Sequence, residues 1–139
     1  MSSLPPPGPR PVPDPDIAGA PFWEAAARHE LVLHKCASCG VIRHPPRPMC
    51  PACNSMDSIY EPASGRGRIW SWVIAHAPVL PSFAEKVPYN VVVVELDEGV
   101  RMIGNLLDVD NDAIQEGMDV VVDFEDSEEG VSLPVWREA

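Results

Sequence analysis

All four cysteines of the 139-residue chain lie within one short stretch, CASCGVIRHPPRPMCPAC. They form two C-x-x-C pairs, Cys36 with Cys39 and Cys50 with Cys53, and ten residues separate the pairs. A C-x-x-C turn directs two thiolates at one point, and two such turns complete the tetrahedral shell of four sulfurs that zinc prefers. The spacing therefore predicts a structural Zn²⁺ site, with iron as the alternative metal because four thiolates also bind iron.

Other uses of these cysteines fit the sequence less well. A redox dithiol needs one pair next to a βαβ pattern, which the sequence lacks, and disulfides are typical of secreted proteins. Four thiolates leave no open position for water, so we expect the metal to support the fold rather than to catalyse a reaction. Metal binding supplies the stability that a segment of about 30 residues cannot gain from its own core. We interpret the neighbouring His34 and His44 as groups outside the metal shell.

Proline dominates the beginning of the chain. Eight of the 17 prolines lie in residues 1–21, and proline favours extended conformations over helix or sheet. We expect a disordered arm over residues 1–16, a helix and the metal-binding segment over 17–62, and a second domain over 63–139. The first residues lack the apolar stretch of a secretory signal, and the longest aliphatic run, Val91–Val94, is too short to cross a bilayer. These features predict a cytoplasmic protein with reduced cysteines and no membrane contact.

The formal net charge of −11 is unevenly distributed along the chain. Residues 28–68 hold six basic and three acidic side chains, whereas residues 69–139 hold three basic and 15 acidic ones. Binding to nucleic acid depends on neutralising phosphates with Lys and Arg, so this overall acidity argues against it. The basic middle segment still suits one small polyanion.

A helix and a series of short strands are predicted after the arm. Pro21 favours a first helical turn, and the residues WEAAARHE favour a helix of about ten residues. Beyond the cysteines we expect five strands: 68–76, the two strands of the hairpin YNVVVVELDEGVRMIGNLLDV, 119–126 and 131–136. A short helical turn in DVDNDAIQEGMD separates the third strand from the fourth. This order matches the five-stranded OB-fold barrel, so the fold class is expected to be mainly β.

The first of these strands carries a candidate stacking surface. Strict alternation places Arg68, Trp70, Trp72, Ile74 and His76 on one face of it. Two indoles beside an arginine can stack on a base or an adenine ring. The alternative is that one or both tryptophans fill the core or an interface.

Sequence motifs of catalysis are missing. No serine lies in a G-x-S-x-G elbow, and neither G-x-x-x-x-G-K nor G-x-G-x-x-G occurs. The sequence therefore gives no reason to regard the chain as an enzyme.

Several stretches together resemble a known family. They are FWEAAARHELVLHKCASCG, PPRPMCPAC, GRGRIWSWVIAHAP, VPYNVVVVELDEGVRMIGNLLDV and EGMDVVVDF, within residues 20–137. The chain resembles the OB-fold, zinc-ribbon, acyl-CoA-associated proteins known as domain of unknown function 35. The resemblance implies a helical N-terminal hairpin, a rubredoxin-like zinc ribbon and a C-terminal OB-fold domain. It also implies that Cys36, Cys39, Cys50 and Cys53 are the zinc ligands, and it supplies no catalytic residue.

Members of that family work beside thiolase-like, aldolase or hydratase subunits, as scaffolds or as binding elements for the CoA thioester. The resemblance thus implies a non-catalytic accessory subunit in lipid, sterol or related acyl-CoA metabolism. Because CoA carries a diphosphate and a 3′-phosphate, we expect basic and aromatic residues to bind it. The candidates are Lys35, Arg43, Arg47, Arg66, Arg68, Trp70 and Trp72, and the candidate partner interface is Phe22 with Trp23.

Two alternatives stay open. Lys35, Arg43 and Arg47 can instead offset the −2 charge of a four-thiolate zinc site. Zinc ribbons and OB-folds also occur in proteins that bind single-stranded nucleic acid, which is the alternative function.

Overall fold

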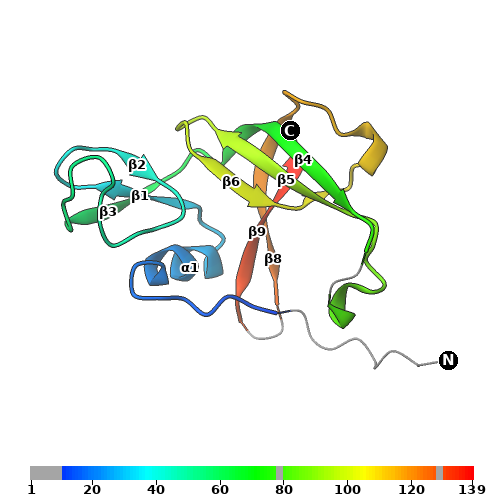
Figure 1. Cartoon of the computed structure of the whole chain (residues 1–139), viewed down its shortest axis with the longest axis horizontal. Coiled ribbons are helices and arrows are strands. Elements are labelled where there is room, and N and C mark those ends of the chain that lie inside the picture. The colour runs from blue at the N-terminus through cyan, green and yellow to red at the C-terminus, as the bar shows by residue number, and fades with distance from the viewer. Residues whose placement is uncertain (1–10, 78–79, 128–129) are drawn as a thin grey trace.

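The computed structural model describes residues 11–77, 80–127 and 130–139. One helix precedes two β-sheets, a three-stranded sheet in the order β2-β1-β3 and a six-stranded sheet in the order β6-β5-β4-β8-β9-β7 (Figure 1). Strands thus dominate the described chain, which confirms a mainly β fold. No helix in the described ranges has both the length and the apolar character needed to cross a membrane.

The helix α1 spans Ala20–Ala27, and Asp16 organises its start. The Gly19 N–H donates to the Asp16 carboxylate at 2.6 Å, and the Ala20 N–H donates to the Asp16 carbonyl at 2.9 Å. Pro21 lies in the first turn, as predicted, because a first-turn residue needs no N–H donor. The expected arm falls largely on residues 1–10, which lie outside the described residues.

The zinc ribbon is the small sheet of β1 (Val32–Cys36), β2 (Ile42–Arg43) and β3 (Ser58–Pro62), together with the cysteine turns that follow β1 and β2. The central strand β1 pairs antiparallel with both neighbours. Figure 1 shows the ribbon at one end of the molecule, with α1 beneath it and beside β9. The helix contacts both β1 and β9, so it links the two sheets.

The larger sheet has the OB-like order but contains one more strand than the sequence predicts. Its strands are β4 (Arg66–Ala75), β5 (Tyr89–Leu96), β6 (Arg101–Gly104), β7 (Leu106–Leu107), β8 (Asp119–Asp126) and β9 (Ser132–Glu138). The extra strand β7 is only two residues long, too short for a pattern, and it pairs parallel with β9. The sheet is therefore an incompletely closed barrel, with a gap between its edge strands β6 and β7, and we call it the barrel below.

Two short 3₁₀ turns connect these strands. The turn η2 (Asn111–Ala113) lies between β7 and β8, where the sequence predicts a helical turn. The turn η1 (Pro81–Phe83) lies in the connection from β4 to β5. The β5–β6 hairpin turns across Gly99, whose φ of 90° suits a residue without Cβ.

One hydrophobic core joins the helix, the ribbon and the larger sheet. Every second residue of β5 from Asn90 to Leu96 is buried, as expected for a strand with one face on the core. Trp136 is completely buried at its centre. Phe22 of α1 and Leu33 of β1 belong to the same cluster, so the ribbon is packed onto the barrel rather than tethered to it.

Candidate metal centre and the ribbon–barrel junction

The four cysteine sulfurs form one cluster at the tip of the ribbon. All four Sγ atoms lie within 4.8 Å of one another, and the Cys36–Cys53 and Cys39–Cys50 pairs are each 3.6 Å apart. A tetrahedral Zn²⁺ about 2.3 Å from each sulfur places the sulfurs about 3.8 Å apart. The cluster therefore has the size of a zinc shell, in agreement with the predicted structural zinc.

The two cysteine turns share one backbone geometry. The Gly40 N–H donates to the Cys36 carbonyl at 3.0 Å, and the Asn54 N–H donates to the Cys50 carbonyl at 2.9 Å. Gly40 and Asn54 both have positive φ, 80° and 62°, so each turn ends in a left-handed residue. Glycine and asparagine are the residues that adopt this conformation at least cost.

Backbone amides lower the pKa of two of the four thiols, Cys36 and Cys50, whereas the pKa of Cys53 is raised. The Cys39 N–H donates to the Cys36 sulfur at 3.4 Å and is the main reason that the pKa of Cys36 falls to about 6. The Cys53 N–H lowers the pKa of Cys50 in the same way. A lowered pKa favours the thiolate, the form that binds metal. Since four thiolates fill a tetrahedral shell, this centre supports the fold and leaves no position for a reacting water.

The two nearby histidines are packing residues and lie outside the thiol cluster. The His34 ring stacks on Tyr60 with centroids 4.9 Å apart, and its Nδ1 accepts a hydrogen bond from the Arg47 N–H at 3.4 Å. Burial, and then the charge of Arg43, lowers the pKa of His34. The His44 ring lies 5.4 Å from the Phe22 ring, and burial lowers the pKa of His44 to about 4.

The basic candidates do not converge on one site. Lys35 pairs with Glu61 at 3.0 Å, beside the zinc centre. Arg66 lines a cavity whose wall also contains Asp97 and Asp119. Arg68 stands in register with the acidic Asp119 on one side and Glu95 on the other. These three side chains therefore have carboxylates nearby, which leaves Arg43 and Arg47 as a separate group.

Arg43 and Arg47 line a cavity between the ribbon and the barrel, and Arg101 joins them there. This junction cavity has a volume of about 380 Å³. It is lined by Ile42, Arg43, His44, Pro45, Arg47, Pro51, Gly99, Val100 and Arg101. Sequence reasoning missed Arg101, whose only signal is that it is a lone basic residue at the end of an acidic hairpin turn.

A β-bulge divides the predicted stacking surface. The register of β4 against β5 shifts between Ile69 and Ser71, so Trp70 is an extra residue in its strand. Trp70 remains exposed, and the guanidinium carbon of Arg101 lies 3.7 Å from the centre of its ring. Trp72 packs against the core instead. The prediction that both indoles share one face is therefore wrong, because one inserted residue reverses the alternation.

The two aromatic residues of α1 differ in exposure. Phe22 is buried in the core, whereas Trp23 is partly exposed. Their rings meet edge to face with centroids 5.1 Å apart. Phe22 thus docks inside this chain, which corrects its assignment to a partner interface, and Trp23 alone remains a candidate contact.

An apolar patch covers the outer face of β4, β5 and β6. We call the outer face the surface formed by Val73, Val91, Val93 and Ile103, which the strand register brings together, and by Trp70, which lies beside them under Arg101. Val73 and Ile103 have exposed fractions of 63% and 67%, large for aliphatic side chains. A row of charged residues borders this patch, Arg68, Glu95 and Arg101.

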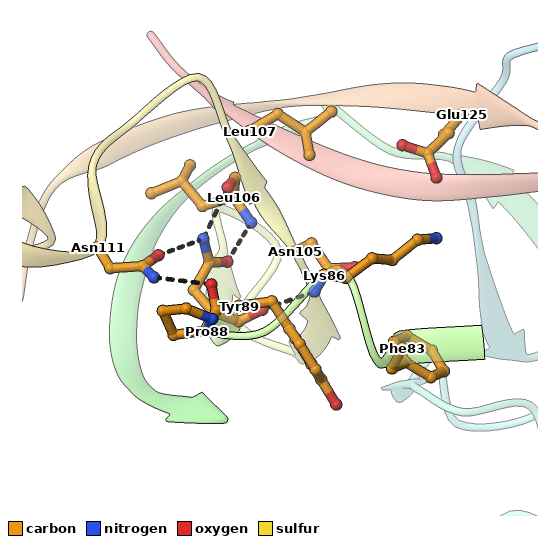
Figure 2. A pocket seen from close by; sticks show the side chains of 10 residues that line it. Phe83, Lys86, Pro88, Tyr89, Asn105, Leu106, Leu107, Asn111 and Glu125 are labelled. Atoms are coloured by element: carbon orange, nitrogen blue, oxygen red, sulfur yellow. Dashed lines mark hydrogen bonds between the residues drawn. The ribbon is translucent and has the colours of Figure 1, made fainter. Parts of the chain in front are cut away.

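A second cavity of about 320 Å³ lies at the other end of the barrel (Figure 2). Figure 2 shows that Asn105 and Asn111 line it together with Phe83 and Lys86. The asparagine amides are occupied by internal hydrogen bonds: Asn105 Nδ2 donates to the Asn90 carbonyl, and Asn111 Nδ2 donates to the Pro88 carbonyl. We therefore interpret these polar groups as structural: they tie the segments that contain Asn105 and Asn111 to the start of β5.

A serine, a histidine and an aspartate meet near the end of α1, but in the wrong order for a catalytic triad. The Ser132 hydroxyl donates to Asp126 at 2.5 Å, and His29 Nε2 lies 2.7 Å from the same Asp126 oxygen. In a triad the imidazole lies between the other two groups and takes the proton of the hydroxyl. Here the carboxylate lies in the middle, so the trio fastens α1 to β8 and β9.

Comparisons with known proteins agree with this architecture. The family model described as the ChsH2 rubredoxin-like zinc ribbon domain matches residues 23–56, and that of the ChsH2 C-terminal OB-fold domain matches residues 60–125. A chain of the solved structure named Ltp2-ChsH2(DUF35) aldolase is 40% identical, with a TM-score of 0.84. That likeness covers 91% of this chain and 98% of the other.

Two relatives show different overall lengths. The chain is 43% identical over 132 residues to the probable enoyl-CoA hydratase alpha subunit of Thermomonospora curvata, covering 94% of this chain but 40% of that subunit. It thus spans about two fifths of that relative. It is also 37% identical to a DUF35 domain-containing scaffold protein of Methanothermobacter thermautotrophicus, covering 75% of this chain and 81% of that protein. With its four-cysteine ribbon packed on an OB-like sheet, the chain belongs to the DUF35 family.

Proposed function

We propose that this chain is a non-catalytic accessory subunit that binds a thiolase-superfamily, aldolase or hydratase enzyme and helps it to hold acyl-CoA. The observation that carries the proposal is the match to nearly the full length of a chain in Ltp2-ChsH2(DUF35) aldolase. The scaffold protein of Methanothermobacter thermautotrophicus has a similar extent and supports the same role.

The chemistry of the described residues also favours a non-catalytic role. The zinc shell is closed, so no metal-bound water is available as a nucleophile. The His34 and His44 rings pack against Tyr60 and Phe22, and Ser132 is bonded to a carboxylate rather than to an imidazole. An accessory role needs surfaces rather than reacting groups, and the outer face supplies one.

The outer face is our candidate surface for the catalytic partner. Exposed aliphatic side chains such as Val73 and Ile103 are stabilised when a partner covers them, and a charged border is typical of interfaces. Trp23, a partly exposed residue of α1, is a second candidate contact.

Purification from the native cell tests this proposal. The tagged chain is recovered under mild conditions, and the proteins that accompany it are identified by mass spectrometry. We expect an enzyme acting on acyl-CoA esters in stoichiometric amount, and we expect the purified chain alone to turn over no acyl-CoA ester. Turnover by the lone chain, or recovery without any enzyme, contradicts the proposal.

The alternative function is binding to single-stranded nucleic acid. Residues 69–139, with three basic and 15 acidic side chains, disfavour it because contact with phosphates requires positive charge. A filter-binding titration over a range of salt concentrations distinguishes the two functions: steep, salt-dependent affinity for single strands supports the alternative.

A further inference from the structure

The junction cavity is lined by three arginines and by no acidic residue, in a chain with a net charge of −11. Arg43 and Arg47 come from the ribbon, and Arg101 comes from the start of β6. Positive charges repel one another, so three guanidinium groups around one cavity cost free energy unless an anion lies among them. This concentration of charge is the first sign of an anionic ligand.

Arg43 is the second sign, because it is buried and no carboxylate of the described residues pairs with it. Its exposed fraction is 7%, and its Nη2 donates to the Arg47 carbonyl at 2.9 Å. Its Nε and Nη1 atoms are buried and have no hydrogen-bond partner in the described parts of the chain. A buried charge without a paired carboxylate is strongly unfavourable, so an anion bound close to it stabilises it.

The other two arginines remain accessible. The Arg47 guanidinium makes no hydrogen bond or ion pair with the described residues, although the Arg47 backbone binds His34 and Arg43. Arg101 lies over Trp70, and its only acidic contact in the described chain is Glu95, at the long distance of 3.5 Å. The Arg47 side chain can turn toward an incoming anion without losing a partner, whereas Arg101 exchanges Glu95 and the Trp70 ring for it.

We propose that the junction cavity binds a phosphoryl group, held by Arg47 and Arg101 and neutralising Arg43. Guanidinium forks match phosphate oxygens in pairs, and a volume of about 380 Å³ accommodates a diphosphate. CoA is the phosphate-bearing ligand that we expect an accessory subunit of an acyl-CoA enzyme to meet, so this part of the proposal rests on the proposed function. A free phosphate or diphosphate ion has the same chemistry and is distinguished below.

Calorimetry on the full, zinc-loaded chain tests the site. The probes are sodium diphosphate, CoA, 3′-dephospho-CoA and pantetheine, which carries no phosphate. We expect diphosphate and CoA to bind and pantetheine not to bind. We expect Arg47→Gln and Arg101→Gln each to raise the Kd for CoA about tenfold, as the loss of a charge-assisted pair implies. Arg28→Gln removes one exposed positive charge outside the cavity and should leave that Kd unchanged.

Several outcomes overturn the proposal. Equal weakening by Arg28→Gln means that only net charge matters, and diphosphate binding without CoA binding excludes CoA as the ligand. If Arg43→Gln folds, loses zinc and leaves CoA binding intact, Arg43 serves the thiolate charge instead. If the chain assembles with its enzyme but binds no phosphate probe, the phosphoryl site is wrong and the accessory role stands. If the chain binds CoA but recruits no enzyme, the accessory role is wrong and the phosphoryl site stands.

Discussion

Asn90 on β5 and Leu106 on β7 exchange two hydrogen bonds. Asn90 Nδ2 donates to the Leu106 carbonyl at 2.9 Å, and the Leu106 N–H donates to Asn90 Oδ1 at 2.7 Å. The amide side chain thus imitates a strand partner for the first residue of β7, at a place where no strand pairs on that side. Because both residues are buried, water does not replace these bonds when one partner is lost.

The two hydrogen bonds between Asn90 and Leu106 predict a large loss of stability for Asn90→Ala. The substitution leaves the Leu106 N–H and carbonyl buried without partners, so we expect the free energy of unfolding to fall by about 2–4 kcal/mol. Urea unfolding of the zinc-loaded chain measures it. Asn111→Ala is the matched control, since Asn111 is partly exposed and its two contacts are each 3.3 Å long. Equal losses for the two variants contradict the special role of Asn90.

The zinc centre gives the second prediction. Cys39→Ser removes one of four thiolates, and a ribbon that depends on its metal then loses most of its support. We expect a zinc-poor chain that aggregates, measured by metal analysis and size-exclusion chromatography. Ser38→Ala is the neighbouring control, because it removes only the hydroxyl bond to Ser55. A Cys39→Ser chain that is monomeric and unfolds cooperatively shows that the metal is dispensable for the fold.

The metal centre was fully readable from the sequence, because a zinc shell requires only four thiolates at a local spacing. The hairpin of β5 and β6 was likewise predicted, but the run Val91–Val94 is apolar throughout and does not reveal which face is buried. The bulge at Trp70 was not predictable, because nothing in the strand's sequence marks the position at which its register against β5 shifts. The sequence also did not predict that Arg43 and Arg101 line the same cavity, since this depends on how the ribbon packs against the β5–β6 turn.

His44 predicts how stability depends on pH. Its pKa is about 4 in the folded chain, because burial disfavours the charged ring, against 6.5 as the ordinary value. As the pH falls from 6.5 toward 4, the unfolded chain binds a proton that the folded chain does not, so stability decreases over this window. Between pH 7 and pH 5 this residue should cost about 2 kcal/mol.

Replacing His44 isolates its share of this loss. His44→Phe keeps an aromatic ring beside Phe22 and cannot take up a proton. Unfolding of both chains at saturating zinc, at pH 7 and pH 5, should show a smaller loss in the variant. His34, whose pKa is also lowered, contributes a similar slope to both chains and cancels in the comparison. Parallel pH profiles for the two chains mean that His44 titrates in the ordinary way.

The outer face predicts where the catalytic partner binds. Ile103→Asp places a charge on that apolar surface, and burying an unpaired carboxylate at an interface is strongly unfavourable. We expect co-purification with the partner to fall at least about tenfold, while zinc content and unfolding remain unchanged. Met56→Asp is the control, because Met56 is an apolar ribbon residue with an exposed fraction of 61%, close to that of Ile103. Trp23→Ala tests the second candidate contact and should weaken assembly more than zinc binding. If Met56→Asp abolishes co-purification and Ile103→Asp does not, the partner binds the ribbon, and the assignment of the outer face is wrong.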